Sequence, residues 1–182
     1  INLYSYDNKT YLDFGSGIAV NSLGHCHPRL VKVLKEQSEK LWHTSNLYYN
    51  HKQEEYAKLL CKYSFAEKVF FTNSGVEAIE CGIKIIRSYN NQKKNNNRIN
   101  IITFEGAFHG RTITALSAQK NNKNTHLFKP LLDGFVQIPF NDLEIIKKTI
   151  DENTAAIMVE TIQGEGGIRP LSISILESIK EL

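Results

Sequence analysis

The feature that most constrains this sequence is an alternation of short apolar runs with amphipathic segments over its second part. The apolar runs are rich in Ile, Val and Phe, which is typical of buried strands. They lie at Val69–Thr72, Ile99–Phe104, Phe135–Ile138 and Ala155–Val159. Amphipathic helical segments separate them, at Val76–Tyr89, after Arg111, at Asp142–Ile150 and from Ser174 onward. This order predicts an α/β fold whose mainly parallel sheet is covered by helices on both faces.

The beginning of the chain follows a different pattern. Two short strand-like runs, Leu3–Tyr6 and Thr10–Phe14, flank a turn-forming segment and predict a hairpin. Loop residues follow, and a helix is expected from Pro28, where proline suits the first helical position. A second helix is expected over Gln53–Tyr63, where apolar residues recur at helical spacing.

We therefore divide the chain into an N-terminal hairpin and helix segment, 1–50, and a large α/β domain, 51–182. The polar run Asn90–Asn97 is interpreted as a solvated surface loop. The last segment, Ser174–Leu182, has a helical pattern with no terminal glycine or turn after it. Because a helix in such a fold normally returns to another strand, we expect the large domain to be incomplete.

Charge and cysteine content exclude several classes of protein. The 22 Lys and Arg against 19 Asp and Glu give a net charge of +3, too small to predict binding to nucleic acid or an anionic membrane. No apolar run approaches the roughly 20 residues of a membrane span. The three cysteines, Cys26, Cys61 and Cys81, form no Cys-x-x-Cys pair and are expected to be reduced. These features favour a soluble, cytoplasmic protein.

Three loops that follow predicted strands carry the residues with chemical potential. In the first, Ser74, Gly75 and Val76 lie where a strand turns into a helix. The unpaired amides at a helix start suit a phosphate, and glycine lets the backbone approach it closely. An ordinary helix cap, with Ser74 as the capping residue and Glu77 at the third position, explains the same residues. Both interpretations remain open.

The second loop contains Phe108 and Arg111, and the third contains Glu165 between glycines. Phe108 could stack on a planar ring, and Arg111 could bind a carboxylate through two parallel hydrogen bonds. The alternatives are a core aromatic residue, a surface arginine and a plain Gly-rich turn. The His25-Cys26-His27 triplet lacks a further ligand at suitable spacing, so no metal site is expected.

Taken together, the loops resemble those of the class III (subgroup II) aminotransferases, which use pyridoxal 5′-phosphate. The similarity covers essentially the whole chain. Its motifs are Tyr11–Val20, Leu23–Pro28, Asn73–Ala78, Phe108–Thr112, Pro139–Asp142 and Gln163–Gly167. The resemblance implies a fold-type-I pyridoxal-phosphate-dependent transferase. Two positions depart from the family pattern: Ile79, where asparagine is usual, and Thr161, where proline is usual.

The resemblance also implies roles for individual residues. Ser74 and the amides of Gly75 and Val76 would hold the cofactor phosphate, and Phe108 would stack on its pyridine ring. Arg111 would bind the α-carboxylate of the substrate, and Glu165 would lie on the substrate side. No catalytic residue is assigned within the chain, because the family's Schiff-base lysine is expected beyond Leu182, as is the aspartate that pairs with the pyridine nitrogen.

The activity implied is transfer of an amino group from N-acetylornithine to 2-oxoglutarate, a step of arginine biosynthesis. The stretch His43–Asn50 favours this substrate by resemblance. The same family includes ornithine, succinylornithine and γ-aminobutyrate aminotransferases, which remain alternatives. The family also implies a homodimer for the complete protein. A different hypothesis is a non-catalytic remnant, suggested by the missing lysine and by Ile79 and Thr161.

Overall fold

The computed structural model describes residues 1–93, 97–119 and 125–182. Its contacts divide the chain into two compact units, Ile1–Val69 and Phe70–Leu182, and each is described by itself. The division into domains 1–50 and 51–182 stays a prediction. No helix among the described residues combines the length and apolar character that crossing a membrane requires.

The first unit begins with the predicted hairpin. Strands β1 (Asn2–Tyr4) and β2 (Thr10–Leu12) pair antiparallel, with Leu3 opposite Tyr11. Two longer helices follow, α2 (Pro28–Ser38) and α3 (His51–Lys62). The side chain of Asn50 caps α3 by accepting a hydrogen bond from the Gln53 amide at 3.2 Å. Both helices confirm the sequence prediction to within a few residues.

Between hairpin and α2 the backbone forms a left-handed turn, labelled α1 (Ser16–Ala19), rather than an ordinary loop. All four of its residues have positive φ, including Ile18 at 59°, which is rare for a β-branched side chain. The Asp13 carboxylate supports the turn by accepting the amides of Gly15 at 3.0 Å and Ser16 at 2.9 Å. The turn is thus held at its start by a side chain that precedes it.

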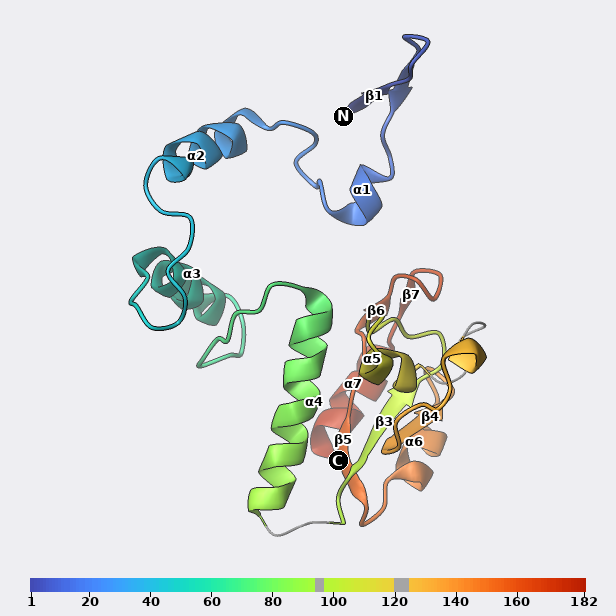
Figure 1. Cartoon of the computed structure of the whole chain (residues 1–182). Coiled ribbons are helices and arrows are strands. Elements are labelled where there is room, and N and C mark those ends of the chain that lie inside the picture. Colours follow the sequence, from blue (N-terminus) through green and yellow to red (C-terminus); the bar gives the residue numbers. More distant parts are fainter. Residues whose placement is uncertain (94–96, 120–124) are drawn as a thin grey trace. The chain divides into compact units, whose positions relative to one another are not determined.

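The second unit is built on a parallel sheet of three strands in the order β4-β3-β5 (Figure 1). The strands are β3 (Asn100–Phe104), β4 (Phe135–Ile138) and β5 (Thr154–Ile157). The helices between them are α5 (Ile113–Ser117), the 3-10 turn η1 (Thr125–Phe128) and α6 (Leu143–Thr149). This part confirms the predicted parallel α/β architecture.

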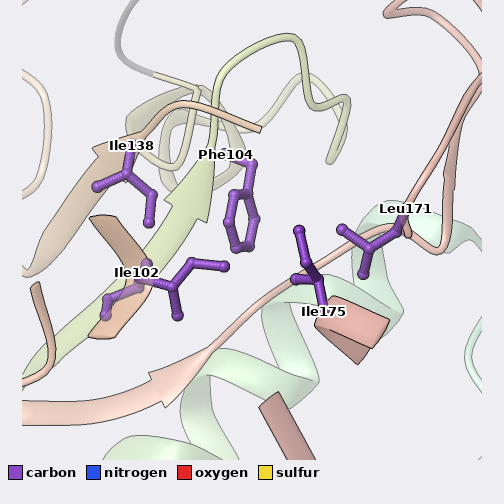
Figure 2. Close-up of a cluster of buried hydrophobic side chains, with 6 residues drawn as sticks. Ile102, Phe104, Ile138, Leu171 and Ile175 are labelled. Atoms are coloured by element: carbon purple, nitrogen blue, oxygen red, sulfur yellow. The ribbon is translucent and has the colours of Figure 1, made fainter. Parts of the chain in front are cut away.

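Helices pack on both faces of this sheet because alternate residues of β3 point to opposite sides. On one face, Ile102 and Phe104 of β3 pack with Ile175 of α7 (Ile173–Glu181) (Figure 2). Ile146 of α6 belongs to the same cluster. On the other face, Ile101 packs with Ile83 of α4 (Gly75–Gln92), together with Ala118 and Phe135. The predicted covering of the sheet on both faces is confirmed.

Two sequence predictions fail, one at the boundary between the two units and one at the end of α4. Val69–Thr72, predicted to be a strand, is not one, because no described strand pairs with it. The polar run Asn90–Asn97 was predicted to be a loop, yet α4 continues to Gln92 and Asn90 is 5% exposed. The Asn90 side-chain amide donates to the Ile86 carbonyl at 2.9 Å, which satisfies this buried polar group within its own helix. Residues 94–96 of that run lie outside the described residues.

The Gly-rich segment after β5 also contains structure that the sequence did not predict. Ile162–Gln163 (β6) and Arg169–Pro170 (β7) form a short antiparallel pair, and Glu165 lies in the turn between them. Such two-residue strands are too short to produce a periodic pattern in the sequence.

Candidate active site

The three parallel strands end at the same edge of the sheet, and this edge carries the candidate site. In open α/β sheets the crevice outside the carboxyl ends of the strands is the usual place for a ligand. A cavity of about 870 Å³ lies here. Its walls include Phe108 and Arg111 from the loop after β3, Gln137 from β4 and Glu165 from the β6–β7 turn. Three of the predicted site residues therefore share one cavity.

The start of α4 is a complete helix cap. The Ser74 hydroxyl accepts the Glu77 amide at 3.3 Å, and the Glu77 carboxylate accepts the Asn73 amide at 2.6 Å. The capping interpretation that the sequence left open is therefore confirmed. It does not use the amides of Gly75 and Val76, which are the first two of the helix and have no acceptor within it. Gly75 is exposed, and a Cβ atom added to it would meet no atom within 4 Å.

This helix start adjoins the loop that carries Phe108 and Arg111, although it is not part of the cavity wall. A Cβ atom added to Gly110 would lie 2.3 Å from Cγ2 of Val76, so glycine is needed for the close approach. The backbone of Gly110 also has a φ of 123°, which favours glycine. Two residues later, the Thr112 hydroxyl donates to the Glu80 carboxylate of α4 at 2.5 Å.

Phe108 and Arg111 contact each other within the loop. The guanidinium carbon of Arg111 lies 5.7 Å from the centroid of the Phe108 ring, a distance typical of a cation–π contact. The Phe108 side chain is 38% exposed and Arg111 is exposed. A planar aromatic surface and a cation with two parallel donors are thus available at the same wall of the cavity.

Side chains from other elements hold this loop in place. The Glu160 carboxylate accepts the Phe108 amide at 3.0 Å. Near the end of α5, the buried Gln119 amide group donates to the Gly110 carbonyl at 3.0 Å. At the loop's start, the Glu105 carbonyl accepts bonds from Gln163 at 3.0 Å and Arg169 at 3.1 Å.

Burial shifts the protonation of two groups around the loop. Burial raises the pKa of the Glu160 carboxyl, and the bond from the Phe108 amide opposes this shift only in part. Burial lowers the pKa of His109, which is 5% exposed. The Nε2 atom of His109 is buried without a hydrogen-bond partner. A neutral imidazole is therefore favoured beside Phe108.

Glu165 reaches the cavity because two loops approach each other closely. A Cβ atom on Gly166 would lie 2.7 Å from the Gly106 carbonyl oxygen. Arg169 reinforces this approach, since its guanidinium also donates to the Gln163 side chain at 2.6 Å. Of the two glycines beside Glu165, Gly166 is the one that this close approach requires, whereas Gly164 has open space at its Cβ position.

Several residues around the site were not identified from the sequence. Glu160 had a recognisable signal, because it is a carboxylate directly after an apolar strand at the ligand-binding edge of the sheet. Glu80, within α4, and Gln119, just after α5, carried no such signal, since polar residues in and next to amphipathic helices are normally solvated. Among the described residues, no group of three or more potential metal-binding side chains comes together.

Comparison with known proteins identifies the family. The family model for class-III aminotransferases matches residues 1–182. The chain is 49% identical over 180 residues to the acetylornithine aminotransferase of Agrobacterium fabrum, covering 99% of this chain and 45% of that protein. It is 51% identical over 174 residues to the acetylornithine aminotransferase of Mesorhizobium japonicum, covering 96% and 44%. The chain thus spans a little under half the length of these relatives.

Solved structures give the same result. The ornithine aminotransferase of Toxoplasma gondii ME49 matches with a TM-score of 0.91 at 30% identity, over 99% of this chain and 44% of that one. The N-acetylornithine aminotransferase of Stenotrophomonas maltophilia K279a matches with a TM-score of 0.81 at 36% identity, over the same shares. The fold of this chain is thus that of part of a fold-type-I aminotransferase, and the chain belongs to the class-III aminotransferase family.

Proposed function

We propose that this chain forms part of the cofactor and substrate site of an aminotransferase that uses pyridoxal 5′-phosphate. The observation that carries the proposal is the meeting of the α4 start with the Phe108–Arg111 loop at the carboxyl edge of the sheet, through the contact between Val76 and Gly110. A second structure of the Toxoplasma ornithine aminotransferase is described as having partial occupancy of PLP at the active site.

The residues present fit a phosphorylated aromatic ring. The space above Gly75 is open, and the amides of Gly75 and Val76 lack acceptors within α4. A helix start is favourable for a phosphate dianion because of both the free amides and the helix dipole. Ser74 can add its hydroxyl hydrogen, since its oxygen serves the cap as an acceptor. Phe108 would cover one face of the ring.

The cofactor supplies the electron sink that makes the bonds at the substrate's α-carbon labile. The residues of this chain would bind and orient the substrate and the cofactor. Arg111 would grip the α-carboxylate of the amino-acid or 2-oxo-acid substrate, and Glu165 would meet the distal part of the substrate across the cavity. A neutral His109 adds no charge behind Phe108. The lysine that carries the cofactor, and the partner of the pyridine nitrogen, are expected beyond Leu182.

For the substrates we propose N-acetylornithine and 2-oxoglutarate. The support is the identity of 47–51% to relatives named acetylornithine aminotransferase, and the stretch His43–Asn50. Ornithine is the second candidate, since the Toxoplasma ornithine aminotransferase matches the fold with a TM-score of 0.91. We further propose that the complete protein is a cytoplasmic homodimer.

The test is an assay of the full gene product that contains this chain. With pyridoxal phosphate and 2-oxoglutarate supplied, we expect faster turnover of N-acetylornithine than of ornithine, succinylornithine or γ-aminobutyrate. Faster turnover of ornithine would overturn the substrate assignment. A reading frame that stops at Leu182, with no turnover of any of these amines, would favour the non-catalytic remnant.

A further inference from the structure

One contact joins the ends of two neighbouring strands, and the proposed function does not account for it. Glu160 lies just beyond β5, and Phe108 lies just beyond β3. The Glu160 carboxylate accepts a hydrogen bond from the Phe108 amide at 3.0 Å. β3 and β5 are paired in the sheet, so their ends lie side by side. The contact therefore connects the loop carrying Phe108 and Arg111 to the segment that follows β5.

The position of Glu160 is unfavourable for a carboxyl group unless it makes such a bond. Burial disfavours its charged form and raises its pKa, which costs free energy that an exposed glutamate would not lose. A hydrogen bond from a backbone amide to a charged oxygen is stronger than one between neutral groups, and it offsets part of this cost. A partly buried carboxyl with one well-formed amide bond is thus suited to fixing that amide.

The orientation of the Phe108 ring depends on how the backbone at Phe108 is held. The flanking parts of the loop are held elsewhere, at the Glu105 carbonyl by Gln163 and at the Gly110 carbonyl by Gln119. Phe108 lies between these two supports in the sequence, and the Arg111 guanidinium lies over its ring at 5.7 Å. A rotation of the backbone at Phe108 would turn the ring and displace the surface on which Arg111 rests.

We propose that Glu160 is a positioning residue, which fixes the Phe108 backbone and thereby orients both the Phe108 ring and Arg111. The inference rests on the proposed function only for the roles of that ring and that arginine. The contact itself can be tested without cofactor or substrate.

The experiment uses nuclear magnetic resonance on the full gene product that contains this chain, prepared without cofactor and isotope-labelled at phenylalanine and arginine. Glu160→Ala removes the acceptor, whereas Glu160→Gln keeps an oxygen that can accept the Phe108 amide. Glu152→Ala is the control, because Glu152 is an exposed acid outside the site. Two quantities are measured: hydrogen exchange of the Phe108 amide, and the ring-current shift that the Phe108 ring causes on the Arg111 side chain.

In Glu160→Ala we expect Phe108 amide exchange to rise about tenfold or more, as for loss of a charged hydrogen bond. Most of the Arg111 ring-current shift should disappear. Glu160→Gln should retain both signals, and Glu152→Ala should change neither. In the unmodified chain the Phe108 amide shift should follow a titration centred above 4.5, the ordinary glutamate pKa, and this titration should be absent from Glu160→Gln.

An Arg111 ring-current shift that is unchanged in Glu160→Ala would overturn the positioning role. A Phe108 amide shift that does not respond to pH would overturn the contact. Neither outcome bears on cofactor binding. Failure of the full gene product to turn over amines, with these signals as expected, would count against the proposed function and leave Glu160 as the residue that orients the loop.

Discussion

The most informative single residue is Arg111, because it is a charged donor placed against an aromatic ring at the cavity wall. Its guanidinium lies over Phe108, and Glu165 lines the same cavity with the opposite charge. A substrate that carries a carboxylate could bind Arg111 while its distal part approaches Glu165.

We predict that Arg111→Ala in the full gene product weakens binding of the amino-acid substrate far more than binding of the cofactor. Losing a charged, two-pronged contact should cost on the order of 1.5–3 kcal/mol, seen as a rise in KM of at least about tenfold. Arg111→Lys keeps the charge but loses the paired geometry, so its KM should lie between those of the unmodified protein and Arg111→Ala. Unchanged kinetics for N-acetylornithine in Arg111→Ala would remove this residue from the substrate site.

We predict that His109 makes stability fall on mild acidification. Its pKa is lowered in the folded state, so below about pH 6.5 the unfolded state binds more protons than the folded state does. The free energy of unfolding therefore decreases as pH falls through this window, by at most about 1.4 kcal/mol per pH unit for one group. His109→Gln should flatten this slope between pH 7.5 and 5.5, measured by urea unfolding.

The control for this pH dependence is His126→Gln, because His126 is an exposed histidine of the same unit. It should leave the slope unchanged. An equal slope in His109→Gln and in the unmodified chain would show that His109 gains its proton as easily when folded as when unfolded.

At the level of elements, the start of α4 depends on a close approach that only glycine permits. We predict that Gly110→Ala destabilises the second unit by about 2–4 kcal/mol, through the clash with Val76 and the positive φ. Gly82→Ala, in the middle of α4 with open space at its Cβ position, should stabilise the unit by about 0.4–1 kcal/mol. Denaturant unfolding of both variants measures the two changes.

Equal stability for these two variants would contradict the packing of α4 against the loop. A loss of stability in Gly82→Ala would likewise show that the helix meets a neighbour there. Both variants replace glycine with alanine, and only the surroundings differ. The pair therefore separates the effect of the clash at Gly110 from the general effect of adding a methyl group.

Which elements the sequence predicted follows from how each one is stabilised. β4 was predicted to the residue, because its apolar side chains face a core on either side of the sheet. Val69–Thr72 has the same apolar pattern and is no strand, since apolar character does not supply a pairing partner. The end of α4 was missed because the Asn90 side chain bonds to its own helix, which composition alone does not indicate.

Part of the candidate site was predicted because the order of the elements along the chain places certain loops at the sheet edge. Ser74, Phe108 and Arg111 stand directly in loops after strands or strand-like runs, so their positions at the sheet edge follow from the order of elements. The cap by Ser74 followed from the spacing to Glu77. The hydrogen bonds that hold the Phe108–Arg111 loop could not be predicted from the sequence. The bond between Glu160 and Phe108, for example, joins residues 52 positions apart.

At the scale of the whole molecule, the two units differ in how much they bury. No residue in the first unit, 1–69, all of which the structure describes, is buried. On α2, Leu30, Val33 and Leu34 are 56%, 60% and 71% exposed and occupy neighbouring positions on the helix. An apolar stripe of this kind favours association with another surface.

We predict that the isolated 182-residue chain self-associates through such surfaces. Replacing Leu30 and Leu34 with glutamate should lower the average sedimentation coefficient at a given concentration, with the far-ultraviolet circular dichroism unchanged. Lys32→Gln together with Lys35→Gln, on the same helix, changes the net charge by the same two units and controls for charge. Equal sedimentation of the unmodified chain and the double leucine variant would exclude α2 as the associating surface.

The central claim is that the start of α4 holds the phosphate of the cofactor. The most direct measurement is a magnetic-resonance titration of the labelled chain with pyridoxamine 5′-phosphate, which has no aldehyde to react with lysines. We expect the amides of Gly75 and Val76 to shift, together with the Phe108 ring signals. Pyridoxamine without the phosphate should leave these amides unmoved. Shifts that map elsewhere, or amides equally affected by both compounds, would contradict the assignment.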